Sequence, residues 1–515
     1  MGKRKRLAAL LCAVVMALTL LPVQAWATEE TEGTRYRAWY DAVTGETHRE
    51  ALPEGTMLQP FPADEQSDIA LFAEDEEPDI DSYFLEINEY LSRYGYSTLQ
   101  SMGNDTLLQV YAQLLWIASN YLTDAYFLID KATISTEEAE LVTQAFYADW
   151  PEIFWARPVY TMPYEGAEVC DGVGFVYNEH AFSAAQLEQL ESGETLDGKS
   201  ALLEQNQTKF LDAAGELIYG GKYPSGGDYD KELYLHDRLL AHVTYDDAYL
   251  NEQNAYTAIV EGKAVCAGYA FAFQYLLMRN GIESYYVVGT AGVDKAGKPV
   301  GHAWNIAKIS GVWYYVDPTW DDSDDEYAPY HAYFNLDTDL LTRDHALDPY
   351  PYNVTLPDCN ELNWFYHQRG DGTMVSTTET DLADTIFILL QNIGIARVYV
   401  TDSDPTLMKT WFEQNHQKLA EAMGITGPYR YGIAWCGPEY VLSLEAVSYD
   451  LNGDDSVDIL DVQVLYAYLT TGVFSAPDTS PDKDTFLKWA DINGDELIDV
   501  YDLQLLYENI SGIRE

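Results

Sequence analysis

The spacing of apolar residues changes several times along the chain, and each change predicts a different kind of element. Between residues 81 and 228 apolar side chains recur every three or four positions, as one face of an α-helix requires. Ser135, followed three residues later by Glu138, predicts a capped helix start, and Pro151 predicts its end. We therefore expect residues 81–228 to be a helical support region. Its clearest apolar stripe consists of Leu107, Leu108, Tyr111, Leu114, Leu115, Ala118 and Leu122.

The first 80 residues lack this period. The basic cluster Lys3–Arg6 precedes an apolar run from Leu7 to Val23 and then Ala25-Trp26-Ala27. This pattern is typical of an export signal with a small-residue cleavage site, so residues 1–27 are predicted to be a signal peptide. No later segment is apolar enough to span a bilayer, so we expect a secreted protein with no membrane span after signal removal. Residues 28–80 are rich in Glu, Asp, Pro and Thr, which predicts a disordered acidic leader.

Residues 229–345 combine a helix with β-rich segments. An apolar stripe formed by Tyr269, Phe273 and Leu276 predicts a helix that begins directly after Cys266. The positive end of a helix dipole favours the thiolate form of a cysteine at this position. Gly268 beside it would leave room for a substrate backbone.

Two β-rich segments, 303–306 and 312–316, are joined by the turn dipeptide Ser310-Gly311. If the turn has two central residues, His302 and Asp317 lie on the same face of the sheet, one diagonal step apart and within reach of a hydrogen bond. A shift of one residue would place them on opposite faces. The His302–Asp317 pair therefore depends on the register of this hairpin.

A Cys, a His and an Asp in this order supply the nucleophile, the general base and the orienting carboxylate of thiol catalysis. Taken alone, Cys266 would be interpreted as a small buried apolar residue. The downstream pair His302 and Asp317 favours the catalytic interpretation instead. This chemistry requires no cofactor.

Residues 346–446 predict a small α/β accessory domain. The pattern indicates helices at 382–392 and 405–423 and strands at 397–400, 429–435 and 440–444. This region carries no recognisable chemical constellation, and a spacer or substrate-binding role is the working hypothesis.

Residues 447–515 contain an internal repeat, in which each copy leads into an apolar helix. Side-chain oxygens occupy positions 1, 3, 5, 9 and 12 of each copy, the arrangement that calcium requires as a hard cation. The sequence therefore predicts two Ca²⁺ sites. The expected ligands are Asp450, Asn452, Asp454, Asp458 and Asp461 in the first loop and Asp491, Asn493, Asp495, Asp499 and Asp502 in the second.

Composition limits the choice of partners. The chain has 515 residues, 47% of them hydrophobic, and a formal net charge of −55. This length predicts several domains, and the charge excludes nucleic acid as a partner because phosphates would be repelled. Basic or neutral proteins and divalent cations are favoured. Only Cys170, Cys266, Cys359 and Cys436 follow the signal segment, which is too few for a disulfide framework.

The central blocks resemble the transglutaminase-like superfamily, a branch of the papain-like thiol enzymes. The resemblance covers about 231–322 and implies an α+β core in which a helix carrying Cys266 packs on an antiparallel sheet carrying His302 and Asp317. It implies that Cys266 is the nucleophile, His302 the base and Asp317 the carboxylate that sets the imidazole tautomer. It also implies that Tyr256 and the backbone N–H of Cys266 stabilise the oxyanion. The matching blocks are Lys231–Leu233, His236–Asp237, Val243–Asp246, Ala264–Tyr269, Gly301–Asn305 and Val316–Trp320.

The C-terminal repeat resembles a type I dockerin over about 447–512, which implies an all-α calcium module that binds a cohesin-type scaffold protein. Ile459-Leu460 and Val500-Tyr501 replace the small hydroxyl residues often found at the recognition positions. A calcium-stabilised terminal cap without a partner is the alternative.

Together these features predict a multidomain α+β protein: a secreted cysteine-dependent enzyme that acts on peptide or carboxamide bonds of a protein substrate through a thioester. Hydrolysis would make it a protease or amidase. Attack by a lysine amine would make it a protein-glutamine γ-glutamyltransferase, a cross-linking enzyme. A non-catalytic peptide- or glycan-binding scaffold component is the alternative from another class.

Overall fold

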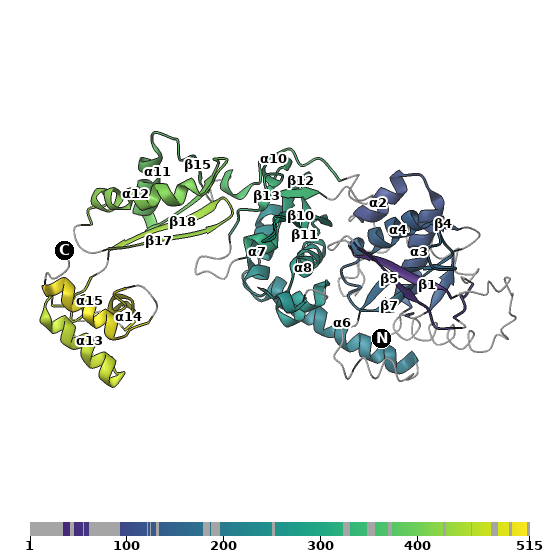
Figure 1. Ribbon diagram of the computed structural model, residues 1–515, viewed down its shortest axis with the longest axis horizontal. Coiled ribbons are helices and arrows are strands. Elements are labelled where there is room, and N and C mark those ends of the chain that lie inside the picture. Colours follow the sequence, from purple (N-terminus) through teal and green to yellow (C-terminus); the bar gives the residue numbers. More distant parts are fainter. Residues whose placement is uncertain are drawn as a thin grey trace.

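The computed structural model describes residues 34–41, 46–54, 56–60, 93–120, 122–123, 125–129, 133–178, 186, 196–249, 253–322, 330–347, 356–368, 373–425, 429–446, 448–454, 456–474, 483–493 and 497–511. The predicted signal peptide lies outside these residues. Figure 1 shows the N-terminal unit in purple and blue, the central unit in teal, the accessory unit in green and the C-terminal helices in yellow.

The N-terminal unit is a sheet covered by helices, and not the purely helical support predicted for 81–228. Its five strands follow the order β2-β1-β5-β7-β3. The expectation of a disordered leader is wrong for 34–60, because Ala38 is fully buried and β1 pairs with both β2 and β5. The bounds are β1 (Tyr36–Asp41), β2 (Glu46–Ala51), β3 (Tyr126–Leu128), β4 (Ile134–Ser135), β5 (Ala156–Met162), β6 (Val169–Cys170), β7 (Gly172–Tyr177), α2 (Tyr94–Ser101), α3 (Asp105–Ser119) and α4 (Thr136–Asp149).

The helix start predicted at Ser135 is present. The Ser135 side chain accepts from the N–H of Glu138, and the Glu138 carboxylate accepts from the N–H of Ser135, so both partners of the capping box are satisfied. A long helix, α6 (Leu196–Tyr219), leads from the N-terminal unit into the central unit. Local capping signals were therefore sufficient to place this helix start, whereas the sheet depends on strands far apart in the chain.

The central unit places one buried helix, α8 (Cys266–Arg279), against a five-stranded sheet of order β13-β12-β11-β10-β14. The hairpin register is the one that brings His302 and Asp317 to one face, since Ile309 pairs with Val312 and Asn305 with Val316. The remaining bounds are α7 (Asp228–Leu240), β8 (Thr244–Tyr245), β9 (Lys263–Ala264), β10 (Ser284–Val293), β11 (Pro299–Ile309), β12 (Val312–Val316), α9 (Pro318–Asp321), β13 (Phe334–Leu336), α10 (Thr338–Leu341) and β14 (His345–Leu347).

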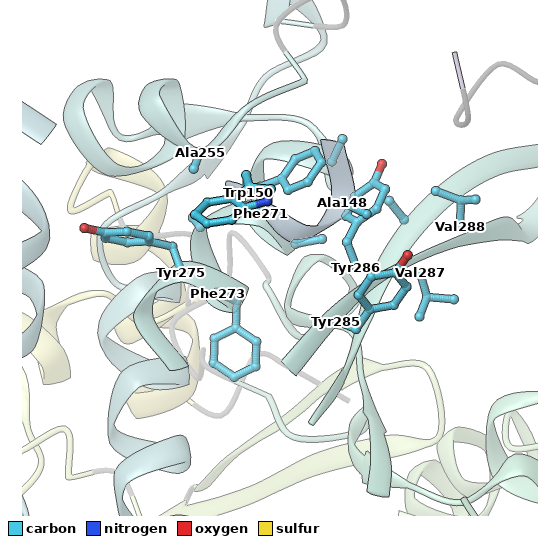
Figure 2. Packing of buried hydrophobic residues seen from close by; sticks show 14 of the residues in the cluster. Ala148, Trp150, Ala255, Phe271, Phe273, Tyr275, Tyr285, Tyr286, Val287 and Val288 are labelled. Carbon is cyan, nitrogen blue, oxygen red and sulfur yellow. The ribbon is translucent and has the colours of Figure 1, made fainter. Parts of the chain in front are cut away.

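The N-terminal and central units share one hydrophobic core (Figure 2). Phe271 of α8 stacks on Tyr286 of β10, with ring centroids 4.1 Å apart and an interplanar angle of 2°. Tyr147 of α4 meets the same Phe271 ring edge-on at 5.0 Å. Burial of an aromatic side chain of this size contributes roughly 2–3 kcal/mol. Helix α8 is thus held between the two units, which limits how far its first residue, Cys266, can move.

The accessory unit is a four-stranded sheet of order β15-β16-β18-β17 with two helices and its own hydrophobic core. The predicted boundary after residue 345 is too early, because Cys359 and Phe365 are fully buried in the core of the central unit. The bounds are β15 (Thr373–Val375), α11 (Leu382–Ile393), β16 (Ile395–Val400), α12 (Leu407–Ala422), β17 (Tyr429–Cys436) and β18 (Glu439–Ala446).

The C-terminal unit consists of α13 (Ile459–Thr471), α14 (Lys483–Ala490) and α15 (Val500–Ser511) around a separate core. Leu451, Leu465 and Leu506 are fully buried in that core. Among the residues that the structure describes, no helix combines the length and the apolar character needed to cross a membrane.

Candidate active site

Cys266 is the first residue of α8 and is 5% exposed. Val265 before it is extended, with φ −100° and ψ −179°, so the chain enters the helix abruptly and the thiol lies at its N-terminal end. The aligned peptide dipoles favour negative charge there. Gly268 does not serve substrate approach as expected. A Cβ at Gly268 would lie 2.6 Å from the Ala264 Cβ, so this glycine allows the helix start to pack against the preceding segment.

His302 and Asp317 meet as the hairpin register predicts. His302 lies on β11, and its Nε2 is 2.6 Å from Asp317 Oδ2. Asp317 follows β12 directly and caps α9: its Oδ1 accepts from the backbone N–H groups of Thr319 and Trp320, at 3.0 and 3.2 Å. Asp317 is fully buried, so its position and charge are set by these partners and not by water.

The charges of this site support one another. Burial alone would lower the pKa of His302, but the negative charges of Asp317 and Cys266 and hydrogen bonds to both side chains raise it to about 10. The same contacts, with those from His345, hold the pKa of Asp317 well below its usual range despite its burial. Because His302 Nε2 faces Asp317, the ring presents Nδ1 to the thiol. The arrangement can hold a thiolate–imidazolium pair and pass a proton between Cys266 and a leaving group.

Tyr256 does not take the oxyanion position that the resemblance implied. Its ring lies 4.6 Å from Phe154 and is stacked 6.5 Å from Phe210, within the shared core. The Asn254 side chain accepts from the N–H groups of Tyr256 and Thr257 and starts the π-helix Thr257–Glu261. This turn directs the ring toward the N-terminal unit, and Tyr256 is a packing residue.

Tyr245 is a residue of the site that sequence reasoning missed, although it lies in one of the matching blocks. Burial and then the nearby charge of Cys266 raise the pKa of its phenol to about 12, and Asp317 adds to the effect. The residue is 46% exposed. Tyr245 is thus a partly exposed phenol on the same side of the unit as the thiol, and its ring is stacked 6.4 Å from that of Tyr269 on α8.

Trp320 and His345 are further neighbours of the catalytic pair that the sequence did not reveal. The Trp320 ring lies 5.8 Å from the His302 ring and 4.5 Å from the His345 ring. A Cβ at Gly292 would lie 3.6 Å from the Trp320 ring, so the indole covers this glycine. No local pattern marks His345, which joins the site only when β14 pairs with β10.

A second buried cluster surrounds His236 of α7. His236 Nδ1 is 3.1 Å from Asp237 and its Nε2 is 3.2 Å from Asp321. His331 Nε2 reaches Asp237 at 2.8 Å. Burial alone would lower the pKa of His236, but its contacts with Asp237 and Asp321 raise it to about 9. The cluster joins α7, α9 and the 330–347 segment behind the site, which fits a structural role.

In the described parts of the two predicted calcium loops, the last carboxylate of each loop accepts the same set of hydrogen bonds. Asp461 Oδ1 accepts from the N–H groups of Leu451 and Asn452, at 2.6 and 3.1 Å, and its Oδ2 from that of Asp458 at 2.7 Å. Asp502 repeats this pattern with the N–H groups of Ile492, Asn493 and Asp499. Asp495 lies outside the described residues.

The donor chemistry of the first loop fits calcium. Asp450, Asp454, Asp458 and Asp461 supply hard carboxylate oxygens within one short segment. Burial, together with the negative charge of Asp450, raises the pKa of Asp461. Crowding of these carboxylates costs free energy that a divalent cation would offset.

Comparisons with known proteins agree with this domain structure. The family model of the transglutaminase-like superfamily matches residues 219–318, and that of the dockerin type I domain matches residues 448–511. No curated protein matches the chain.

Three solved structures are similar to part of the chain. A candidate cysteine protease from Cytophaga hutchinsonii is 26% identical over 22% of this chain and 38% of its own, with a TM-score of 0.19. A structure described as a TGase is 13% identical over 42% of this chain and 50% of its own, with a TM-score of 0.20. A candidate protease from Parabacteroides distasonis is 11% identical over 55% of each chain, with a TM-score of 0.19. The chain thus spans 38% to 55% of the length of these proteins.

Type I dockerin domains bind calcium, in line with the oxygen-rich loops described above. The chain is thus an α+β multidomain protein that is similar to the transglutaminase-like superfamily over residues 219–318 and to the dockerin type I domain over residues 448–511.

Proposed function

We propose that this protein is a secreted thiol enzyme that cleaves peptide or carboxamide bonds of a protein substrate, with Cys266 as nucleophile, His302 as general base and Asp317 as orienting carboxylate. The observation that carries the proposal is the buried chain from the α8 N-terminus through His302 to Asp317, closed by the 2.6 Å contact. This arrangement supports the proposal because thiol catalysis requires a thiol and an oriented base side by side.

Acylation would proceed as follows. The Cys266 thiolate attacks the carbonyl carbon and forms a C–S bond, and negative charge develops on the carbonyl oxygen. The N–H of Cys266, in the first turn of α8, is the expected donor to this oxyanion. The C–N bond then breaks, His302 gives its proton to the leaving amine, and a thioester remains. Asp317 keeps Nε2 of His302 protonated throughout, so that Nδ1 of His302 accepts and donates the transferred proton.

The acceptor of the acyl group separates the two enzyme hypotheses. Water, deprotonated by His302, would break the C–S bond and release an acid, which is the protease or amidase reaction. A lysine amine would form an isopeptide bond by the same route. The net charge of −55 attracts lysine-bearing proteins and favours this second candidate.

We further propose that the C-terminal module binds two Ca²⁺ ions and docks to a cohesin-type scaffold outside the cell. Each loop is followed by an exposed apolar pair at the start of its helix. Ile459 and Leu460 are 49% and 45% exposed, and Val500 and Tyr501 are 73% and 51% exposed. Two equivalent apolar pairs in an otherwise acidic module are suited to a protein surface.

The enzymatic proposal is tested by incubating a glutamine-containing protein and a labelled primary amine with the full chain or with Cys266→Ala. Mass spectrometry of the products distinguishes backbone cleavage, conversion of carboxamide to acid, and incorporated amine. We expect one of these products from the parent and none from Cys266→Ala. Equal product from both proteins would show that Cys266 is not the nucleophile, and no product from either would favour the non-catalytic scaffold hypothesis.

A further inference from the structure

Asp317 is shared between two histidines. Its Oδ2 is 2.6 Å from His302 Nε2 and 3.0 Å from His345 Nε2. His345 begins β14, is 3% exposed, and reaches Asp317 from the strand that pairs with β10. With the two backbone donors on Oδ1, the carboxylate accepts four hydrogen bonds. Such a carboxylate is a weak base and is held as an anion.

Both ring nitrogens of His345 face carboxylate oxygens. Nε2 faces Asp317, and Nδ1 is 2.6 Å from Asp344 Oδ1. A carboxylate oxygen accepts and does not donate, so both nitrogens can be satisfied only if both carry a proton. His345 is therefore an imidazolium cation. Its pKa is raised by its hydrogen bonds to Asp317 and Asp344, although burial alone would lower it.

Asp344 is itself held in place. Its Oδ2 accepts from the Tyr333 hydroxyl at 2.8 Å, and its backbone carbonyl accepts from the N–H of Gly292. The Asp344 side chain is 34% exposed, whereas that of His345 is fully buried. The ionisable groups that the described contacts place around His345 are Asp344, Asp317, His302 and Tyr333, with Cys266 beyond His302.

We propose, on the basis of the function above, that His345 is a positioning residue of the active site: as a buried cation it shares Asp317 with His302 and sets how firmly the Cys266–His302 pair holds its proton. The physical reason is electrostatic. The ring centroids of His345 and His302 are 5.7 Å apart. A cation at this distance weakens the hold of Asp317 on the His302 proton and stabilises a thiolate at Cys266. Proton delivery to the leaving amine becomes easier and the nucleophile remains charged.

The direction of the pH shift distinguishes this charge effect from a purely structural role in which His345 only holds Asp317 in place. His345→Gln keeps an N–H that can reach Asp317 but removes the charge. If the charge matters, the midpoint of thiolate formation at Cys266 and that of proton loss from His302 both move to higher pH. If His345 only holds Asp317 in place, its loss weakens the Asp317–His302 contact, and the His302 midpoint moves to lower pH.

The experiment measures both midpoints from pH 4 to 11 in the full chain. That of Cys266 comes from its alkylation rate with iodoacetamide, with the modified peptide quantified by mass spectrometry, and that of His302 comes from its imidazole NMR signal. Neither readout needs a substrate, so both stand even if the proposed reaction is wrong. We expect an upward shift of roughly one pH unit in His345→Gln, which is about a tenfold lower rate below the midpoint. Asp344→Asn removes an anion and leaves the His345 cation in place, so both midpoints should move to lower pH, opposite to the shift in His345→Gln.

His416→Gln is the matched control, because His416 lies on α12 of the accessory unit and bonds to Tyr429. Its profile should equal that of the parent. Circular dichroism establishes that each variant is folded, and if His345→Gln does not fold, His345→Asn, which also replaces the cation with a neutral amide, carries the test. An unchanged or lowered His302 midpoint in the folded His345 variant overturns the proposal.

Discussion

At the scale of single residues, the site depends on buried groups whose protonation is set by their neighbours. His302 and Asp317 stabilise opposite charges in each other, which raises the pKa of the imidazole and lowers that of the carboxyl. Glu232 is a contrasting case: it is fully buried on α7, and its Oε2 accepts from the Asn335 side chain at 2.7 Å. Burial raises the pKa of Glu232 to about 8. The hydrogen bond from Asn335 and the nearby His236 lower this pKa, but their effect is smaller than that of burial.

Asp317→Asn should lower kcat by about 10³–10⁴-fold, because an amide cannot hold the required imidazole tautomer. The pKa of His302, about 10 in the parent, should fall once the negative charge of Asp317 is removed. Since the imidazolium is the proton donor, the alkaline limb of the pH–kcat/KM profile should move to lower pH. A profile with an unmoved alkaline limb would show that Asp317 does not act on His302.

Glu232→Gln should change stability in a pH-dependent way. The folded-state pKa of Glu232 is raised above its unfolded value, so the parent loses stability as pH rises from about 4.5 to 8. Glutamine cannot ionise, and the variant should gain about 2–3 kcal/mol relative to the parent between pH 6 and pH 9. Urea unfolding of both proteins at the two pH values measures this. Parallel stability curves would contradict a protonated Glu232.

At the scale of elements, the β17–β18 turn of the accessory unit contacts the back of the active site. The Cys436 thiol donates to the Trp320 carbonyl at 2.6 Å, and a Cβ at Gly437 would lie 2.5 Å from the Tyr333 hydroxyl. Glu439, fully buried at the start of β18, accepts from the backbone N–H of His331 at 2.7 Å. The accessory unit therefore braces the residues that support Asp317 and His345, and is more than a spacer.

Glu439→Gln should destabilise the protein by about 2–4 kcal/mol, because the partly buried Arg397 guanidinium would lose its fully buried countercharge. Thermal unfolding followed by tryptophan fluorescence reports the change. Glu445→Gln on the same strand is the control. Its partner Lys488 is 57% exposed, so this ion pair contributes less than about 1 kcal/mol. Equal losses in both variants would contradict a special role for Glu439.

At the scale of the whole molecule, the cores are distributed unevenly. The N-terminal and central units share one core, whereas the accessory and C-terminal units each have their own. The C-terminal core is small and is bounded by the two acidic loops. Calcium should therefore govern the stability of this unit without altering the chemistry at Cys266.

Calorimetry should detect two calcium sites, and combined Asp450→Ala and Asp491→Ala substitutions should remove both. Chelation by EDTA should lower the melting temperature of the C-terminal unit while kcat remains within about twofold of its value with calcium, since the sites lie in a separate core. Binding that survives the double substitution, or loss of turnover on chelation, would contradict this independence.

Local patterns in the sequence determined much of the site. The apolar stripe after Cys266 predicts α8, and the Ser310-Gly311 turn predicts the register that joins His302 to Asp317. The structure has this register, and both turn residues have positive φ, 52° and 89°. The calcium loops were predictable because all five donors of a loop lie within one short segment. Helix period, turn geometry and ligand spacing are encoded by neighbouring residues.

Only the tertiary structure decided the burial of β1, the packing of Tyr256 and the position of His345, because each of these depends on contacts between segments far apart in the sequence. The acidic composition of 28–80 concealed β1, which becomes buried by pairing with β5. Tyr256 matches a family position, yet its ring packs on Phe154, which precedes it by about a hundred residues. His345 follows Asp317 by 28 residues and reaches it only when β14 adds to the sheet. Burial and strand order, which local periodicity does not encode, brought the second histidine to the catalytic carboxylate.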